Sequence, residues 1–435
     1  MVTEQPNFDV VIAGGGMVGA TLALALQQQG RRVACVDPVP LTAEAGDLSP
    51  SFDSRATACA LTSIWLFKNL GLWPEIEPYA APIQHIDVSR KGQWGKVRMA
   101  AAEIQQQAFG YVIPNAVLGK ALASRWEQLA KAKADNDGAA LQGYWGQKVV
   151  AAEVVQAAGA KQTAVTLDNG ERLRAQLLVV ADGARSPLRA QLGFGSTTID
   201  TRQHALVTNV AVTKPLFGHA FERFTETGPL ALLPLIAQAN QPVATHYNLV
   251  WCGSGADTEA RNGLSDADFL TVLNQQFGAG LGQITALGKR LSFPVSITSV
   301  DRLAADHVVV LGNAAQSLHP VAGQGFNLGL RDVACLVDVL QSADHCGEAG
   351  LTAQYEAARQ ADRQQMLALT TQLATSTTQP ERGLTATAFG LGLAGFGQWV
   401  GAKKALALRA SGLQSALPGL CQHPGSHRAA ALAGR

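Results

Sequence analysis

A glycine-rich turn close to the N-terminus constrains the fold more than any other feature of this sequence. The apolar run 10–13 is typical of a buried strand, and Gly14-Gly15-Gly16-Met17-Val18-Gly19 follows it directly. A helical pattern of leucines then extends to Gly30, and a second apolar run, 33–36, ends at Asp37. This order predicts a strand-turn-helix-strand unit, which begins a parallel α/β sheet covered by helices.

Three glycines of the turn meet the requirements of a dinucleotide-binding site. Gly14 permits the tight turn, Gly16 lets the backbone approach a pyrophosphate, and Gly19 lets helix and strand pack closely. The free amides at the start of the helix favour an anion. Asp37, 23 residues after Gly14, has nearly the spacing of a carboxylate that accepts ribose hydroxyls. An ordinary glycine-rich turn is the alternative, and the strand-helix-strand pattern favours dinucleotide binding.

Length, charge and cysteine content exclude several classes of protein. The 435 residues are enough for two structural units, because single hydrophobic cores stop growing well below this length. The 34 basic and 33 acidic residues leave a net charge of +1, which excludes nucleic acid as a partner. Six cysteines without CxxC or His-Cys spacing indicate buried free thiols in a reducing compartment and no metal site. The polar segment 1–7 has no signal-peptide pattern, so we expect a cytoplasmic protein.

The stretch 383–402 carries no charge and is long enough to span a membrane. Six glycines, two threonines and Gln398 count against a span, and Lys403, Lys404 and Arg409 follow directly. We favour a pair of short packed helices that close the fold. The second possibility is an apolar surface that contacts a membrane or a biosynthetic complex, which would place the protein peripherally at the inner membrane.

The middle of the chain alternates between apolar and polar residues in short runs. Residues 88–99, 206–212 and 246–251 have the period of two that predicts strands, with Pro- and Gly-containing turns between them. They predict an antiparallel sheet outside the nucleotide-binding domain. Residues 115–133 have a helical pattern, and 177–181 form another run typical of a buried strand.

That buried run ends in Asp182-Gly183, a second candidate for ligand contact. A carboxylate at a strand end can accept a hydrogen bond from a bound ligand, and Arg185 or Arg189 can meet a phosphate. The alternative is an acidic turn that caps the short helix expected after Pro187. Its position after a buried strand in a dinucleotide-binding chain favours ligand contact.

A third glycine-rich segment follows the expected strand 307–311. This strand ends at Gly312-Asn313, where ligands of open α/β sheets bind, and the Asn313 carbonyl can accept from a sugar hydroxyl. A loop then opens a helix whose inward face is apolar. Loop amides and the positive helix end suit an isoalloxazine ring, which gathers negative charge near N1 and the C2 carbonyl on reduction. The candidate contacts in the loop are Pro320, Gly323, Gln324 and Gly325.

Together the three segments resemble the fingerprints of the flavin-dependent aromatic hydroxylases, the class A flavoprotein monooxygenases. The resemblance runs from about Phe8 to about Arg363, and it is closest to the ubiquinone-biosynthesis branch, in particular to the 2-polyprenyl-6-methoxyphenol hydroxylases. Asn313 and Gln316 stand where the wider family usually has aspartate and often histidine, and both look like that branch. The finer match is carried by Ala220-Phe221-Glu222-Arg223-Phe224-Thr225, Gly228-Pro229-Leu230-Ala231, Leu249-Val250-Trp251-Cys252 and the segment 318–329.

The resemblance implies an FAD cofactor that NADH or NADPH reduces. The nicotinamide would bind only transiently, because no second GxGxxG occurs. Oxygen would add at the flavin C4a, and the hydroperoxide would hydroxylate the ring of a polyprenylated phenol. Arg55 would lie beside the flavin, with a surface salt bridge as its alternative. His319, beside the glycine loop, is the candidate proton handler for the phenol, with a structural histidine as its alternative.

The implied architecture is α/β, with a Rossmann-like FAD-binding domain, an inserted antiparallel β-sheet substrate domain and a helical C-terminus. The FAD-binding domain would comprise 1–78, 112–190 and 290–375, the substrate domain 79–111 and 191–289, and the tail 376–435. We expect the apolar substrate pocket at Phe221, Phe224, Leu232 and Pro234. Two alternatives stay open: a sister hydroxylase that attacks another ring carbon, and an FAD-binding subunit whose role is assembly in a biosynthetic complex.

Overall fold

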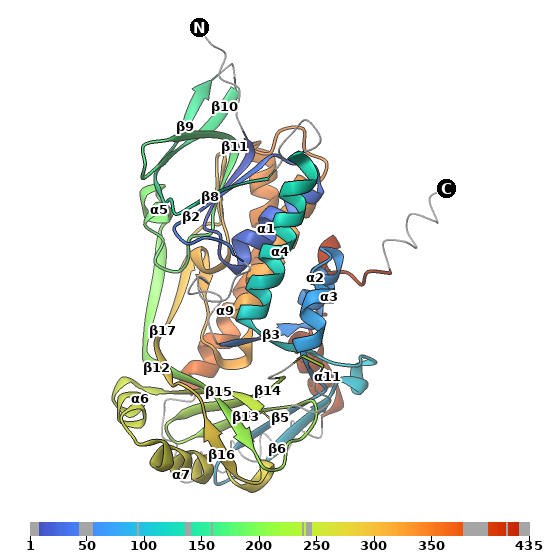
Figure 1. Ribbon diagram of the computed structural model, residues 1–435, viewed down its shortest axis with the longest axis vertical. Helices are drawn as coiled ribbons and strands as arrows, with labels where there is room; N and C mark the ends of the chain where they lie inside the picture. The colour runs from blue at the N-terminus through green and yellow to red at the C-terminus, as the bar shows by residue number, and fades with distance from the viewer. Residues whose placement is uncertain are drawn as a thin grey trace.

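The computed structural model describes residues 8–42, 55–93, 95–134, 141–157, 160–236, 239–240, 246–376, 399–414 and 416–425. Within these ranges the chain forms two large sheets at opposite ends of the molecule, with a small third sheet between them (Figure 1). The long strands β12 (Ser196–Val212) and β17 (Leu291–Val300) run along one side into the second sheet. Each large sheet combines strands from distant parts of the sequence.

The first sheet contains the parallel unit that the glycine turn predicts. Its order is β18-β19-β11-β1-β2-β8, and β1 pairs in parallel with both β2 and β11. β9 and β10 extend it through antiparallel pairs. The strands are β1 (Phe8–Ala13), β2 (Val33–Asp37), β8 (Leu141–Trp145), β9 (Val149–Ala157), β10 (Ala160–Leu167), β11 (Arg172–Val180), β18 (Ala304–Ala305) and β19 (Val308–Val310).

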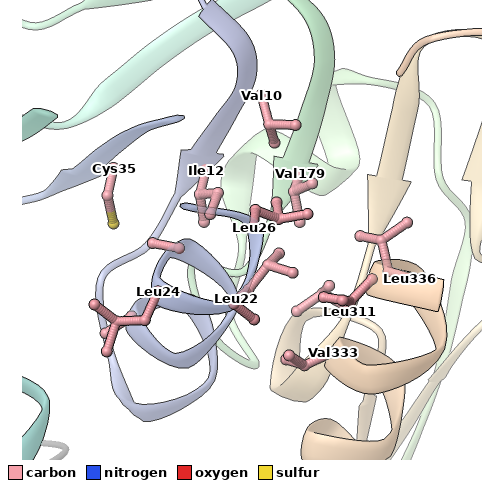
Figure 2. Close-up of a cluster of buried hydrophobic side chains, with 14 of the residues drawn as sticks. Val10, Ile12, Leu22, Leu24, Leu26, Cys35, Val179, Leu311, Val333 and Leu336 are labelled. Atoms are coloured by element: carbon pink, nitrogen blue, oxygen red, sulfur yellow. The ribbon is translucent and has the colours of Figure 1, made fainter. Parts of the chain in front are cut away.

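Apolar side chains fasten this sheet to the helices that cover it. Figure 2 shows Ile12 of β1, Leu22 of α1 (Met17–Gln28) and Val333 of α8 (Gly325–Leu340) in one cluster. Each is fully buried, and a buried side chain of this size contributes roughly 1.5–3 kcal/mol to folding. The helix predicted at 115–133 is α4 (Asn115–Ala134), and it packs beside α1. The strand-helix-strand prediction is confirmed.

The second sheet has the order β20-β17-β12-β15-β14-β13-β5-β6, with β16 beside β12. One departure from the predicted antiparallel sheet is the parallel pair of β13 with β5, which joins two segments more than a hundred residues apart. α6 (Gly255–Asn262) and α7 (Asp266–Phe277) cover its outer face (Figure 1). Its remaining strands are β5 (His85–Arg90), β6 (Lys96–Ala100), β13 (His219–Thr225), β14 (Gly228–Leu235), β15 (His246–Ser254), β16 (Ile284–Leu287) and β20 (Gln316–Ser317).

The small sheet and the remaining helices complete the described fold. The order of the small sheet is β3-β7-β4, with strands β3 (Ala56–Ala60), β4 (Ala81–Ile83) and β7 (Gly110–Pro114). The further helices are α2 (Leu61–Asn69), α3 (Trp73–Ile76), α5 (Pro187–Gln191), α9 (Ala349–Ser376) and α11 (Val400–Ala410). No helix within the described ranges combines the length and apolarity needed to cross a bilayer.

The sequence predictions for the cysteines and the C-terminal stretch have different outcomes. All six cysteines are buried free thiols, as predicted, and burial raises the pKa of each. The stretch 383–402 lies mostly outside the described residues. Its end begins α11, whose Ala407 is fully buried in an apolar cluster with residues of β4 and β6. Trp399 and Val400, at the start of that helix, are 69% and 77% exposed.

Candidate active site

A cavity of about 760 Å³ lies where the first sheet, the small sheet and the second sheet meet. It borders the carboxyl ends of β1, β2 and β11, which is where open α/β sheets bind ligands. Most residues that the sequence nominated line it: Gly14, Gly16, Asp37, Arg55, Asp182, Gly183, Phe221, Asn313, His319, Pro320, Gly323, Gln324 and Gly325. Among the nominated residues, those that do not line it are Gly19, Gly312, Phe224, Leu232 and Pro234.

The turn after β1 requires glycine at Gly14 and Gly19. Gly14 has φ +110°, and a Cβ there would lie 2.4 Å from the Ala181 carbonyl oxygen. A Cβ on Gly19 would lie 1.9 Å from the Gly14 carbonyl oxygen, so Gly19 acts through packing although it does not reach the cavity. Asp37 accepts hydrogen bonds from the amides of Gly15, at 2.6 Å, and Val39, at 2.8 Å. These contacts hold an acceptor carboxylate beside the turn, while burial raises the pKa of Asp37.

The Asp182-Gly183 turn faces the cavity and does not cap the following helix. The N-cap of α5 is Ser186, whose hydroxyl accepts from the Arg189 amide at 2.9 Å. Asp182 accepts a hydrogen bond from the Ser186 hydroxyl and also lies on the cavity wall, where burial raises its pKa. Arg189 has a structural position, because its buried guanidinium donates to the Ala314 carbonyl at 2.9 Å and ties this turn to the third segment.

The third segment presents a loop and a helix end to the cavity. Asn313 is exposed there, directly after β19. Gly312 and Gly323 both have φ +59°, a conformation that side chains other than glycine rarely adopt. α8 begins at Gly325 on the cavity wall, so the free amides and the positive end of the helix lie at the cavity. This is the arrangement that the sequence predicts.

A buried network of charges supports the loop from behind. Asp332 accepts from the Gly312 amide at 3.2 Å, from Gln316 Nε2 at 2.7 Å and from Arg359 Nε at 2.7 Å. Arg363 donates to Gln316 Oε1 at 3.0 Å. Gln316 is 2% exposed, so the residue that departs from the wider family is a link in this network and does not touch the cavity.

His319 has the environment of a structural histidine. Its Nδ1 accepts from the Val321 amide at 3.2 Å, and its Nε2 lies 3.0 Å from Gln203 Oε1, which requires the proton on Nε2. Burial lowers the pKa of His319 to about 4. A ring that is neutral at physiological pH and engaged at both nitrogens has no position free for a substrate proton. The geometry therefore favours the structural alternative over the proton handler.

Of the four predicted pocket residues, Phe221 borders the cavity, and Phe224, Leu232 and Pro234 do not. Successive residues of a strand face opposite sides of a sheet. Leu232 packs in the apolar cluster under α7, and the Phe221 ring packs edge-on against Phe277 of α7 with centroids 5.5 Å apart. The cavity face of β13 and β14 carries instead Ala220, Glu222, Ala231 and Leu233. The prediction had chosen the wrong face of β14.

Glu222 is the unexpected member of this face. It is paired in register with Ala231 on β14 and with Val88 on β5. Ala231 in turn is paired with Val250 on β15. Among the described residues it has neither a hydrogen-bond partner nor a cation. Burial among these apolar neighbours raises the pKa of Glu222 to about 7. A lone acidic residue in an otherwise apolar strand is the sequence signal that could have identified it.

Of the charged wall residues, Arg55 was predicted from the sequence, and its guanidinium lies 4.6 Å from the Phe293 ring centroid. Lys148, just before β9, places a cation at the nucleotide end and had no sequence signal. The apolar end is lined by common core residue types, which only the folded chain distinguishes from the core. They are Ile83, Ile86, Phe109, Ala220, Ala231, Leu233 and Val250.

These wall residues fit FAD. The glycine turn at Gly14, where a Cβ would collide with the Ala181 carbonyl, and the start of α1 supply an anion-binding cradle. Asp37 lies at the position of a ribose acceptor. The start of α8 supplies amides and positive charge for the polar edge of a flavin. The apolar face of the second sheet closes the opposite side. A nucleotide site thus adjoins an apolar chamber, which is the arrangement that a flavin-dependent enzyme needs.

Comparison with known proteins agrees with this conclusion. Residues 7–370 match the family described as FAD binding domain. The chain is 33% identical to ubiquinone hydroxylase UbiL of Rhodospirillum rubrum, with 83% of this chain and 80% of the relative covered. It is 30% identical to the 3-demethoxyubiquinol 3-hydroxylase of Escherichia coli, covering 80% and 83% of the two chains. The fold resembles p-nitrophenol 4-monooxygenase PnpA of Pseudomonas putida, with a TM-score of 0.70, 19% identity and coverage of 94% and 98%.

The protein is an FAD-dependent aromatic-ring monooxygenase. It belongs to the family of ubiquinone-biosynthesis FAD hydroxylases.

Proposed function

We propose that the protein hydroxylates the phenol ring of a polyprenylated ubiquinone precursor of the 2-polyprenyl-6-methoxyphenol type, using O2 and NADH or NADPH. The observation that supports this most is the junction of the glycine-built nucleotide site with an apolar chamber on the inner face of the second sheet. A prenylated phenol has an apolar body and one polar group. The chamber offers the same combination, because its wall on β13 and β14 is apolar except for Glu222.

The residues of the chain have separate tasks in this proposal. Gly14, Asp37 and the start of α1 bind the nucleotide part of FAD, and Asp182 and Asn313 accept from its sugar and ribityl hydroxyls. When bound, FAD supplies the redox and oxygen-activating chemistry. The start of α8 stabilises negative charge on the flavin edge. In each of these tasks the residues of the chain bind or position FAD.

The substrate half excludes water and orients the ring. Ile83, Phe109 and Leu233 form apolar walls, and Ala231 leaves room beside Glu222. Displacing water from such a chamber favours oxygen transfer to the ring over side reactions. The nicotinamide would bind transiently in the open cavity.

The pathway position can be tested by the quinone intermediates of a strain that lacks this protein. Accumulation of a 2-polyprenyl-6-methoxyphenol is the expected result. Accumulation of a demethoxy-quinone would refute the methoxyphenol substrate and favour a sister hydroxylase. That second candidate is favoured by the relative from Escherichia coli, whose name assigns it to 3-demethoxyubiquinol.

An assembly role is the third candidate. Purified protein that binds FAD and shows no increase in NAD(P)H oxidation when a prenylated phenol is added would favour it. A phenol-stimulated rate would exclude assembly as the sole function. The C-terminal contact with a membrane or a biosynthetic complex stays a prediction, and α11 with its exposed Trp399 is the described part of that tail.

A further inference from the structure

We propose that Glu222 is the catalytic base that takes the proton from the phenolic hydroxyl of the substrate during hydroxylation. This inference rests on the proposed function and assigns the acid-base group of the same site. Three observations carry it: the position of Glu222 on the chamber wall, its lack of a protein partner among the described residues, and the unsuitability of the other nearby titratable groups.

The position of Glu222 is central on the cavity face of the second sheet. It lies in the middle of β13, between neighbouring strands that contribute Val88 and Ala231 at the same level. Glu222 is half-buried on this wall, so its carboxyl group loses part of its hydration and receives no hydrogen bond from the described residues in return. This cost is expected where a ligand supplies the missing hydrogen bond.

The other ionisable groups on the cavity wall have different positions or tasks. Asp37, Lys148 and Asp182 lie at the nucleotide end, and His319 is held at both nitrogens. Burial raises the pKa of the Cys59 thiol far above neutrality. Arg55 is a cation and cannot act as a base. The titratable or charged side chains on the strands beside β13 are His85, Asp87 and Arg90 on β5 and, across β14, His246, Tyr247 and Cys252 on β15; β14 has none.

These strand residues do not replace Glu222. Asp87 is paired on the outer face with His219 and Arg98. Tyr247 exchanges hydrogen bonds with the backbone of Leu216, and burial raises the pKa of Cys252 to about 12. Glu222, with a pKa of about 7, is poised to exchange a proton near neutrality.

The phenolic O–H bond breaks, its proton passes to a Glu222 carboxylate oxygen, and the electron pair moves into the ring as the new C–O bond forms at the attacked carbon. One atom of O2 enters the product and the other leaves as water, with two electrons from NAD(P)H. The attacked carbon then loses its hydrogen as a proton to water, and Glu222 returns a proton to the ring oxygen.

Glu222→Gln in the holoenzyme tests the assignment, with Glu226→Gln as a matched control in the exposed turn after β13. The probes are 2-geranyl-6-methoxyphenol and a geranyl demethoxyubiquinol. With whichever probe the wild type hydroxylates, its rate should rise with pH through about 7. In Glu222→Gln, hydroxylation should fall by about 10²–10⁴-fold and lose this inflection, while FAD content is retained and NAD(P)H oxidation yields hydrogen peroxide.

Two further measurements separate the base from a structural carboxyl. Infrared difference spectra of the substrate-free holoenzyme should show a protonated carboxyl band that titrates near pH 7, that Glu222→Gln lacks and that Glu226→Gln retains. Glu222→Asp, which keeps a carboxyl group, should recover part of the hydroxylation. Equal rates and pH profiles in wild type and Glu222→Gln would overturn the assignment alone. Wild-type turnover of neither probe would overturn the proposed function, and the assignment with it.

Discussion

The two halves of the cavity are built by different means. The nucleotide half is made of backbone, with glycines that bring carbonyls and amides close together, and a buried network centred on Asp332 holds it. The substrate half is made of side chains on the flat face of a sheet, with apolar packing behind it under α7. A site built from backbone tolerates few sequences, whereas a site built from side chains can change its ligand through single substitutions.

We expect the largest effect of a single substitution in the nucleotide half of the cavity. Gly19→Ala places a Cβ 1.9 Å from the Gly14 carbonyl oxygen, so the turn must move and FAD should be lost from the purified protein. Absorbance of the released flavin measures this loss. Gly350→Ala, in an exposed helical position with open space around its Cβ, is the control and should retain full FAD content. A yellow Gly19→Ala protein would show that the turn is less tightly constrained than its geometry indicates.

The network behind the nucleotide half should be nearly as sensitive. Asp332→Ala leaves the buried Arg359 without its closest carboxylate and should reduce the free energy of unfolding by about 3–5 kcal/mol, measured with urea. Asp266→Ala breaks a pair with Arg290 whose carboxylate is 74% exposed, and should cost about 0–1 kcal/mol. Equal losses in the two variants would contradict the distinction between buried and exposed pairs.

Two adjacent leucines test the substrate half. Leu232→Ala removes a fully buried side chain from the cluster under α7 and should cost about 2–5 kcal/mol in the free energy of unfolding. Leu233→Ala removes a side chain from the chamber wall and so enlarges the chamber, which should mainly raise KM for the prenylated probe. Urea titration and steady-state kinetics of both variants check the contrast. A raised KM in Leu232→Ala together with a loss of stability in Leu233→Ala would instead support the substrate pocket at Leu232 that the sequence predicted.

The wrong face of β14 shows what the sequence could not supply. Residues 228–235 read Gly-Pro-Leu-Ala-Leu-Leu-Pro-Leu, and both faces of this strand are apolar, one toward the chamber and one toward α7. Without polar alternation, nothing local fixes which leucines face a ligand. The parallel pair of β13 with β5 was equally hidden, because it depends on contacts between distant segments.

The nucleotide half was predictable for the opposite reason. Its constraints are mostly local, because Gly14 adopts a positive φ, Gly19 packs against the Gly14 carbonyl, and the strand after them ends at Asp37. His319 illustrates an intermediate case. Its place beside the glycine loop was evident from the sequence, but its partner Gln203 is more than a hundred residues away, and that contact favours a structural role.

A change of pH should alter the free energy of unfolding in opposite directions through His319 and through Glu222. The pKa of His319 in the folded state, about 4, is below its ordinary 6.5, so the unfolded chain binds the extra proton and stability falls as pH drops from 6.5 to 4. The pKa of Glu222, about 7, is above its ordinary 4.5, so the folded chain binds the extra proton and stability falls as pH rises from 4.5 to 7. Each effect is at most about 3 kcal/mol.

In the wild type, the stability contributions of His319 and Glu222 largely cancel in the pH range where both groups titrate. Substituting one group at a time should reveal each contribution. Relative to wild type, Glu222→Gln should lose less stability as pH rises from 4.5 to 7, and His319→Gln should lose less as pH drops from 6.5 to 4. Urea unfolding at half-unit pH steps gives both difference curves. Two flat difference curves would mean that neither group keeps its shifted pKa in solution.

The smallest expected effect is at α11, which lies on the substrate side of the molecule. Lys403 pairs with Glu103 at 3.1 Å, and the carboxylate is 40% exposed, so Lys403→Ala should cost less than about 1 kcal/mol. The helix is held instead by Ala407, which is fully buried against the apolar cluster of β4 and β6, so Ala407→Asp should release it. Proteolysis near α11 followed by mass spectrometry measures the release. If Lys403→Ala exposes the helix to cleavage as much as Ala407→Asp does, the ion pair and not apolar packing holds α11 in place.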